Sequence, residues 1–166
     1  SFDVGPYELP LVSPMVTSYR SIESRRGVLV SLAEGGLTGW GDACPMVGWS
    51  RSSLDEVTNQ LTVAAARFGS EPLDDVLDML AAVPEARAAL AGAVYDLSAQ
   101  RAGIPLARLL ADTAVERVRV NASIGAAETD RAVDEASRAV TAGFTTLKLK
   151  VGAVSPAADV ARVGAV

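Results

Sequence analysis

The clearest alternation of apolar and polar positions lies in residues 143–152. One face of this predicted strand carries Lys148 and Lys150, and the other is apolar. Helical periodicity predicts one helix before it, in residues 130–141, and another after it, in residues 155–166. A strand between two helices is one step of a βαβ pattern, so we expect it to lie in a parallel sheet. The apolar residues of the strand are Leu147, Leu149 and Val151.

The N-terminal part has a different pattern. Residues 2–12 alternate loosely and contain two prolines, which is typical of an edge strand. Residues 26–32 and 37–43 predict a hairpin around the turn 33–36. Together they predict a three-stranded antiparallel meander. Two further stretches, 13–21 and 44–50, predict loops.

Helices are predicted after the meander, and a second βα pattern begins near residue 115. Ser53 and Glu56 form a capping box at the first helix, and Gly103 ends the longest one. Residues 117–125 then predict a strand that leads into a loop, and the helix at 130–141 follows it. We therefore expect two domains, 1–114 and 115–166. The predicted helices of the first domain span 54–68, 73–82, 84–101 and 105–110.

Composition excludes several classes of function. The net charge is −5 and no basic cluster is present, so we expect neither nucleic acid nor an anionic membrane as a partner. No apolar run reaches membrane-spanning length, and no signal-peptide pattern is present. A single cysteine, Cys44, fits a reducing compartment and predicts a cytoplasmic protein. The absence of histidine excludes Ser-His-Asp chemistry and histidine-bound zinc within this chain.

The lysine pair is the main candidate for chemistry. The chain has 15 Lys and Arg residues, and only Lys148 and Lys150 are lysines. Lysine can accept a proton once it is neutral, whereas arginine stays charged. Two ammonium groups on one strand face lie about 7 Å apart, and their repulsion favours loss of one proton. The residues alone leave a second interpretation open, an exposed edge strand whose lysines prevent aggregation.

An ordered set of short motifs resembles the enolase superfamily, with the muconate-lactonizing subgroup as the most similar group. The resemblance spans nearly the whole chain, and residues 24–52 and 84–110 look most like o-succinylbenzoate synthase. The K-x-K strand is its most specific motif. The motifs are 26–30 (RGVLV), 39–42 (GWGD), 89–90 (AL), 95–97 (YDL), 103–106 (GIPL), 120–121 (VN) and 148–150 (KLK).

The resemblance implies an α+β capping domain, residues 1–114, followed by the first βαβα units of a TIM-type (β/α) barrel, residues 115–166. In such enzymes Lys150 would remove a proton α to a carboxylate, while Lys148 would tune that base and hold the carboxylate. A Mg²⁺ ion would stabilise the resulting enediolate. The residues expected to bind substrate are Arg20, Met15, Trp49 and Ser123. Asp42 stands where the family usually has Glu, and we expect it to be structural.

One departure from the family concerns the metal. Its ligands are acids on later barrel strands, and only 16 residues follow Lys150. Asp130, Asp134 and Glu135 lie on a predicted helix face, where solvated charge is the ordinary role. The sequence therefore predicts an incomplete barrel without metal ligands, whose partners are a small carboxylate substrate and the remainder of the barrel. A homo-oligomer is compatible with this organisation.

Several functions fit these expectations. The best match is o-succinylbenzoate synthase, a dehydrating lyase of menaquinone biosynthesis. N-acylamino-acid racemase, dipeptide epimerase and muconate cycloisomerase share the same proton abstraction. Two alternatives of other classes are an aldolase-like barrel with a Schiff-base lysine and a non-catalytic fragment or assembly module. We expect the full-length protein to be the enzyme and residues 1–166 alone to be inactive.

Overall fold

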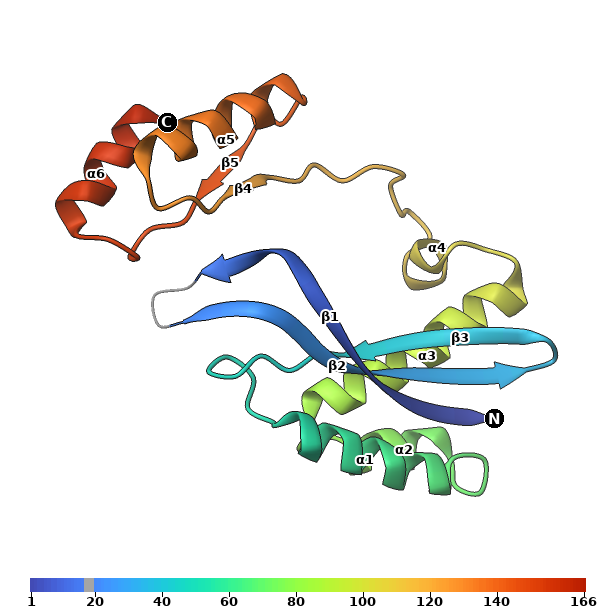
Figure 1. Ribbon diagram of the computed structural model, residues 1–166. Helices are drawn as coiled ribbons and strands as arrows, with labels where there is room; N and C mark the ends of the chain where they lie inside the picture. The colour runs from blue at the N-terminus through green and yellow to red at the C-terminus, as the bar shows by residue number, and fades with distance from the viewer. Residues whose placement is uncertain (17–19) are drawn as a thin grey trace. The chain divides into compact units, whose positions relative to one another are not determined.

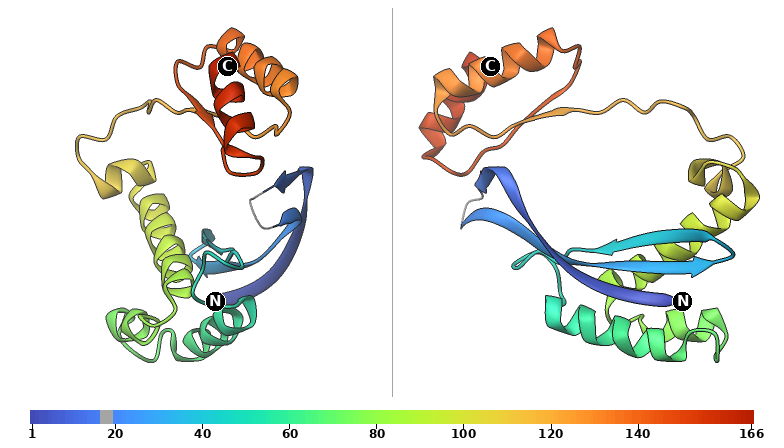
Figure 2. Two further views of the ribbon diagram at one scale, coloured as in Figure 1. Left: turned by 90° about the vertical axis from the view of Figure 1, so that its left-hand side faces the viewer. Right: turned by 45° about the vertical axis from the view of Figure 1, so that its right-hand side comes forward.

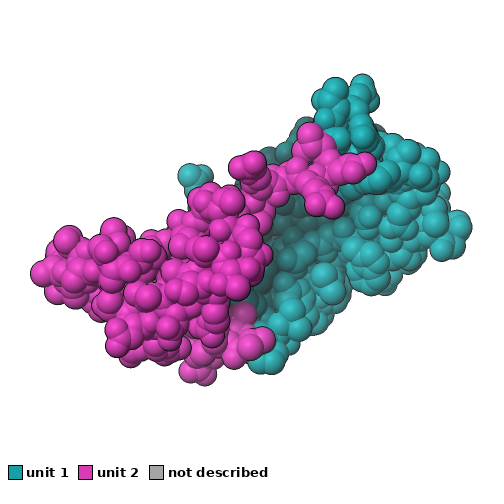
Figure 3. Space-filling model, turned by 90° about the horizontal axis from the view of Figure 1, so that it is seen from above, with its two compact units in different colours: residues 1–10, 24–114 teal, residues 11–23, 115–166 magenta. Residues whose placement is uncertain are grey.

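The computed structural model describes residues 1–16 and 20–166 and divides into two compact units (Figures 1 and 3). The first unit comprises residues 1–10 and 24–114, and the second comprises residues 11–23 and 115–166. Each unit has its own hydrophobic core. No helix in the described part of the chain combines the length and apolar character needed to cross a bilayer.

The first sheet is the three-stranded meander predicted from the sequence. Its strands are β1 (Phe2–Val16), β2 (Ser21–Glu34) and β3 (Leu37–Ala43), in the order β1-β2-β3. β2 and β3 pair antiparallel around a turn at Gly35 and Gly36, whose φ angles are 60° and 81°. Positive φ at both turn positions matches the right-handed twist of a hairpin and favours glycine.

The predicted loop at 13–21 is wrong for most of its length. β1 continues to Val16 and β2 already begins at Ser21, whereas residues 17–19 lie outside the described part. Pro14 lies within β1 and cannot donate a ladder hydrogen bond. However, β1 is at the edge of the sheet, where a missing N–H removes no ladder bond if it faces outward.

Helices complete the first unit (Figure 2). They are α1 (Leu54–Arg67), α2 (Leu73–Met79), α3 (Pro84–Ala102) and α4 (Leu106–Leu110). Ser53 caps α1 by accepting the N–H of Glu56, and Gly103 ends α3 in the left-handed region, as predicted. The core joins the inner face of β2 to α1, α2 and α3, through Val28, Val30, Leu32, Val57, Leu61, Val76 and Leu90.

Glycine brings β3 against α3 at unusually short range. A Cβ atom on Gly41 would lie 1.8 Å from the carbonyl oxygen of Ala89, and one on Gly39 would lie 2.2 Å from that of Ala93. Neither position has room for a side chain, so β3 and α3 are in backbone contact. The small residues Ala89 and Ala93 on α3 permit the same approach from the helix side.

The second unit contains the lysine strand. β4 (Ala122–Ile124) and β5 (Leu147–Leu149) pair in parallel, as predicted, and α5 (Thr129–Thr141) and α6 (Pro156–Ala165) follow them. Both strands are shorter than the sequence pattern suggested, because alternation marks side-chain faces and not the length of the paired ladder. The core consists of Ile124, Ala132, Ala136 and Ala139, with Phe144, Leu147 and Leu149 packed against it.

Candidate active site

The carboxyl end of the β4–β5 ladder brings three predicted site residues onto one face. Ser123 pairs with Lys148 in the parallel register, and Ile124 pairs with Leu149. The backbone N–H of Lys150 donates to the carbonyl oxygen of Ile124 at 3.0 Å, so the hydrogen-bonded ladder extends one residue beyond β5. Because side chains alternate along a strand, Ser123, Lys148 and Lys150 share the face opposite Ile124 and Leu149.

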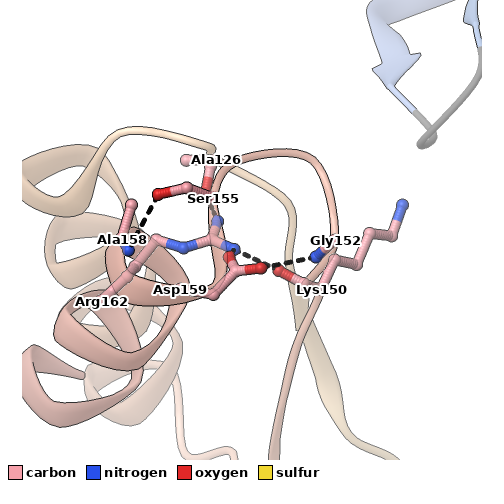
Figure 4. Close-up of polar contacts among 7 residues, drawn as sticks. All are labelled: Ala126, Lys150, Gly152, Ser155, Ala158, Asp159 and Arg162. Carbon is pink, nitrogen blue, oxygen red and sulfur yellow. Dashed lines mark hydrogen bonds and ion pairs between the residues drawn. The ribbon is translucent and has the colours of Figure 1, made fainter.

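Burial agrees with this assignment of faces. Ile124 is 1 % exposed and Leu149 is half-buried against the helices, whereas Ser123, Lys148 and Lys150 are exposed. The Lys150 side chain extends away from the polar groups of α6 (Figure 4). The lysine face is thus the one that α5 and α6 do not cover. Both interpretations of the lysine pair, an inner barrel wall and a solvated edge, require this orientation.

Glu135 of α5 holds the loop that follows β4. Its Oε2 atom accepts the backbone N–H groups of Gly125 at 3.1 Å and of Ala126 at 3.3 Å. The expectation of a solvated charge at this position was therefore wrong, since the half-buried carboxylate satisfies two loop donors. Asp130 and Asp134 are exposed, as expected.

Asp159 of α6 has the equivalent role after β5 (Figure 4). Its Oδ2 atom accepts the N–H of Gly152 at 2.7 Å, and its Oδ1 atom accepts from Arg162 Nη2 at 2.6 Å. The Gly152 hydrogen bond, followed by the contact with Arg162, lowers the pKa of Asp159 against the opposing effect of burial. Gly152 has a φ angle of 94°, so the chain turns there in a conformation that favours glycine.

Arg162 is the most enclosed charged group described. Its side chain is 1 % exposed. Nη2 donates to the carbonyl oxygen of Lys150 at 2.6 Å, and Nη1 donates to that of Ala126 in the loop after β4. One guanidinium therefore connects the chain segments that follow both strands. The Nε atom is buried without a partner among the described residues.

Sequence reasoning missed the pair Asp159 and Arg162. The two residues are three positions apart on α6 and therefore share one helix face. An exposed ion pair on a helix would show the same spacing. No local sequence signal identifies the pair, because the exposure that sets it apart is seen only in the structure, where Val160 is 73 % exposed and Val163 is 55 % exposed. A helix whose charged residues face its own sheet and whose valines face outward departs from the usual surface pattern.

The other predicted binding residues lie apart in the sequence from this ladder. Met15, near the end of β1, is half-buried, and Arg20, just before β2, is exposed. Trp49 lies in the turn after β3 and is 72 % exposed. Their contact with a substrate stays a prediction.

Asp42, expected to be structural, is tied to the sheet. Its Oδ1 atom accepts the phenol hydrogen of Tyr7 at 2.7 Å across the strands. Partial burial, followed by hydrogen bonds with Cys44 and Asp42, raises the pKa of Tyr7 well above its usual value. The Arg25 guanidinium donates to the carbonyl oxygen of Cys44 at 2.7 Å and secures the end of β3.

The described residues do not fit a magnesium site. Residues 1–16 and 20–166 contain no group of three acids, cysteines or histidines placed to hold a metal ion. The two carboxylates that contact the loops after the strands, Glu135 and Asp159, already accept backbone N–H groups. We therefore assign no metal ligand among residues 1–16 and 20–166.

Comparison with known proteins gives a consistent set of relatives. Residues 2–88 match the family model described as MenC, N-terminal domain. The L-Ala-D/L-Glu epimerase of Bacillus subtilis (strain 168) is 27 % identical over 93 % of this chain and 44 % of its own length. The o-succinylbenzoate synthase of Geobacillus kaustophilus is 30 % identical over 87 % of this chain and 41 % of its own length.

A solved structure extends this similarity to the fold. The dipeptide epimerase from Enterococcus faecalis V583, complexed with Mg and the dipeptide L-Leu-L-Tyr, has a TM-score of 0.86 and is 27 % identical. It matches 99 % of this chain, which covers 48 % of that structure. The chain thus spans less than half the length of the curated relatives described above.

Proposed function

Because the chain belongs to the MenC N-terminal domain family, and through it to the enolase superfamily, we propose that it forms part of an enzyme that removes the proton α to a carboxylate. Membership confirms the predicted fold class, an α+β capping domain followed by the first βαβα units of a TIM-type barrel. The domain boundary between residues 114 and 115 remains a prediction.

One observation carries the proposal. The two lysines of the chain share a strand face at the carboxyl end of parallel strands, opposite the helices. In a (β/α) barrel this is the inner face, and the carboxyl ends of the strands are where active sites lie. Both interpretations of the lysine pair share this orientation, so it is membership of the barrel family that favours an active-site role over a solvated edge.

Each lysine has a distinct role in the proposal. The neutral amine of Lys150 takes the α-proton as general base. The ammonium group of Lys148, one step back from the strand end, holds the substrate carboxylate and counters the negative charge that develops beside it. Ser123 pairs with Lys148 and supplies a hydroxyl on the same face. A magnesium ion would need ligands from outside the described residues, so no step is assigned to it.

The substrate-binding roles of Arg20, Met15 and Trp49 also belong to this proposal. The guanidinium of Arg20 can pair with a second carboxylate on a substrate. Met15 and Trp49 offer apolar surface for the rest of the molecule. We also propose that the enzyme is located in the cytoplasm.

Two substrates have specific support. The family model is that of the MenC N-terminal domain, which favours o-succinylbenzoate synthase. Dipeptide epimerases are also similar to this chain, both in sequence and in fold, and this similarity favours epimerisation of a dipeptide. Both reactions begin with removal of an α-proton, so the roles of Lys148 and Lys150 are the same in either case.

The experiment uses the longest natural chain that contains residues 1–166, incubated in D₂O with each substrate and followed by proton NMR. Deuterium entering the α-position of L-Ala-L-Glu together with the second epimer would identify an epimerase. Loss of water with formation of o-succinylbenzoate would identify the synthase. If neither deuterium incorporation nor dehydration is observed with either substrate class, the proposed function is refuted.

A further inference from the structure

We propose that Arg162, held in place by Asp159, is a positioning residue for the proposed base Lys150. The inference rests on the proposed function, because it assigns a role relative to that base. It comes from the contacts of the Lys150 backbone, which Figure 4 shows beside α6. Arg162 itself does not touch the reacting atoms in this proposal.

Both backbone polar groups of Lys150 are fixed. Its N–H donates to Ile124 on β4 at 3.0 Å, and its carbonyl oxygen accepts from Arg162 Nη2 at 2.6 Å. Two residues later, the N–H of Gly152 donates to Asp159 at 2.7 Å. The segment that carries the amine is thus attached to β4 on one side and to a single turn of α6 on the other.

The same guanidinium also joins this segment to the neighbouring strand. Arg162 Nη1 donates to the carbonyl oxygen of Ala126, and Glu135 holds the N–H groups of that loop. The end of β4 and the end of β5 therefore share one buried cation. Arg162 therefore fixes the two strand ends relative to each other. Ser123 lies near the end of β4, so its position relative to Lys150 is fixed as well.

The chemistry of the pair favours geometry over stability as its role. Burying an ion pair carries a large desolvation penalty, and replacing such a pair by well-packed apolar residues is often neutral or stabilising. Arg162 is 1 % exposed and Asp159 is 9 % exposed, so the penalty applies to both. A planar guanidinium can hold two carbonyl oxygens and a carboxylate in fixed directions, whereas an apolar side chain can hold none of them.

Catalysis is sensitive to this kind of placement. A displacement of about 1 Å in a reacting group can lower the rate about 100-fold. The Lys150 side chain is long and flexible, so the position of its backbone sets the region that the amine can reach. Without Arg162, the carbonyl of Lys150 is released and the peptide can rotate toward Gly152.

The test measures α-proton exchange in the longest natural chain that contains residues 1–166. Arg162→Met keeps the length and the apolar stem of the side chain, and Arg162→Lys keeps the charge but loses the fork of donors. We expect Arg162→Met to lower kcat about 100-fold with KM changed less than about threefold, and Arg162→Lys to restore part of the loss. Arg138→Met on the exposed face of α5 is the matched control and should leave both constants unchanged.

Each outcome decides something. Wild-type kcat in Arg162→Met, or a loss that appears only as lower thermal stability, overturns the positioning role and leaves the proposed function standing. Absence of exchange in the wild-type protein overturns the proposed function, and the positioning role with it. If Arg162→Met fails to fold, Asp159→Asn tests the same role. Asn keeps an acceptor for Gly152 but loses the charge that holds Arg162, so kcat should fall about 10-fold at unchanged KM.

Discussion

The backbone contact between β3 and α3 predicts a large effect of adding one methyl group. In Gly41→Ala the new Cβ atom would lie 1.8 Å from the carbonyl oxygen of Ala89 and 2.7 Å from its carbonyl carbon. Both are main-chain atoms, so no side chain can rotate away. To reach ordinary contact distance, α3 and β3 would have to separate locally by roughly 1.5 Å.

The structure sets the size of the effect. Overpacking a well-filled core usually costs about 1–3 kcal/mol. The upper end applies here, because the helix itself must move and its neighbours Ala93 and Leu90 are buried. A loss of about 3 kcal/mol corresponds to a fall in Tm of roughly 10 °C for a chain of this size. Gly39→Ala, with its 2.2 Å contact to Ala93, should behave similarly.

The assay is urea unfolding followed by circular dichroism, with the free energy of unfolding taken from the midpoint and slope. Gly5→Ala is the matched control, because a Cβ atom at Gly5 meets nothing within 4 Å and Gly5 has no left-handed φ angle. We expect the control to stay within about 0.5 kcal/mol of wild type. Equal midpoints for Gly41→Ala and Gly5→Ala would refute the close-contact argument.

Three further predictions follow from single groups. The pKa of Tyr7 is raised in the folded protein, so its phenol contributes its full stabilisation below the unfolded-state pKa of about 10. That stabilisation is lost as pH rises through the pKa of the folded protein. Tyr7→Phe should therefore flatten the alkaline part of a plot of unfolding free energy against pH. The pKa of Asp159 is lowered in the folded protein, so its stabilisation is present above the unfolded-state pKa of 3.8 and is lost as pH falls through the folded-state pKa. Asp159→Asn should therefore weaken the dependence of the unfolding free energy on pH in the acid range. Lys148→Met should raise KM for a carboxylate substrate about 10-fold or more in steady-state assays, and an unchanged KM contradicts its binding role.

Much of the first unit could be predicted because its signals are local. Ser53 and Gly103 mark helix ends through their own backbone chemistry, and Gly35 with Gly36 marks the hairpin turn. β1 is longer than predicted and contains Pro14, which a strand accommodates at an edge, and only the strand order reveals that β1 lies there. Edge position is a tertiary property that no local window contains.

In the second unit, the sequence predicted which strand face each side chain occupies, but not which groups the charged side chains of the helices contact. Alternation placed Lys148 and Lys150 opposite Leu147 and Leu149, and burial in the structure agrees. The partners of Glu135 and Arg162 were not predictable, since each is a backbone group of a loop 9 to 36 residues away. A charged residue on a helix has the same local pattern whether it faces water or a strand end.

Isotope exchange at the α-carbon shows whether Lys150 is the base. The longest natural chain containing residues 1–166 is compared with its Lys150→Ala variant in D₂O, with circular dichroism to verify the fold. We expect the wild-type protein to incorporate deuterium at the α-carbon of its carboxylate substrate and a folded Lys150→Ala variant to incorporate none. Incorporation at the wild-type rate in the variant would show that Lys150 is not the base.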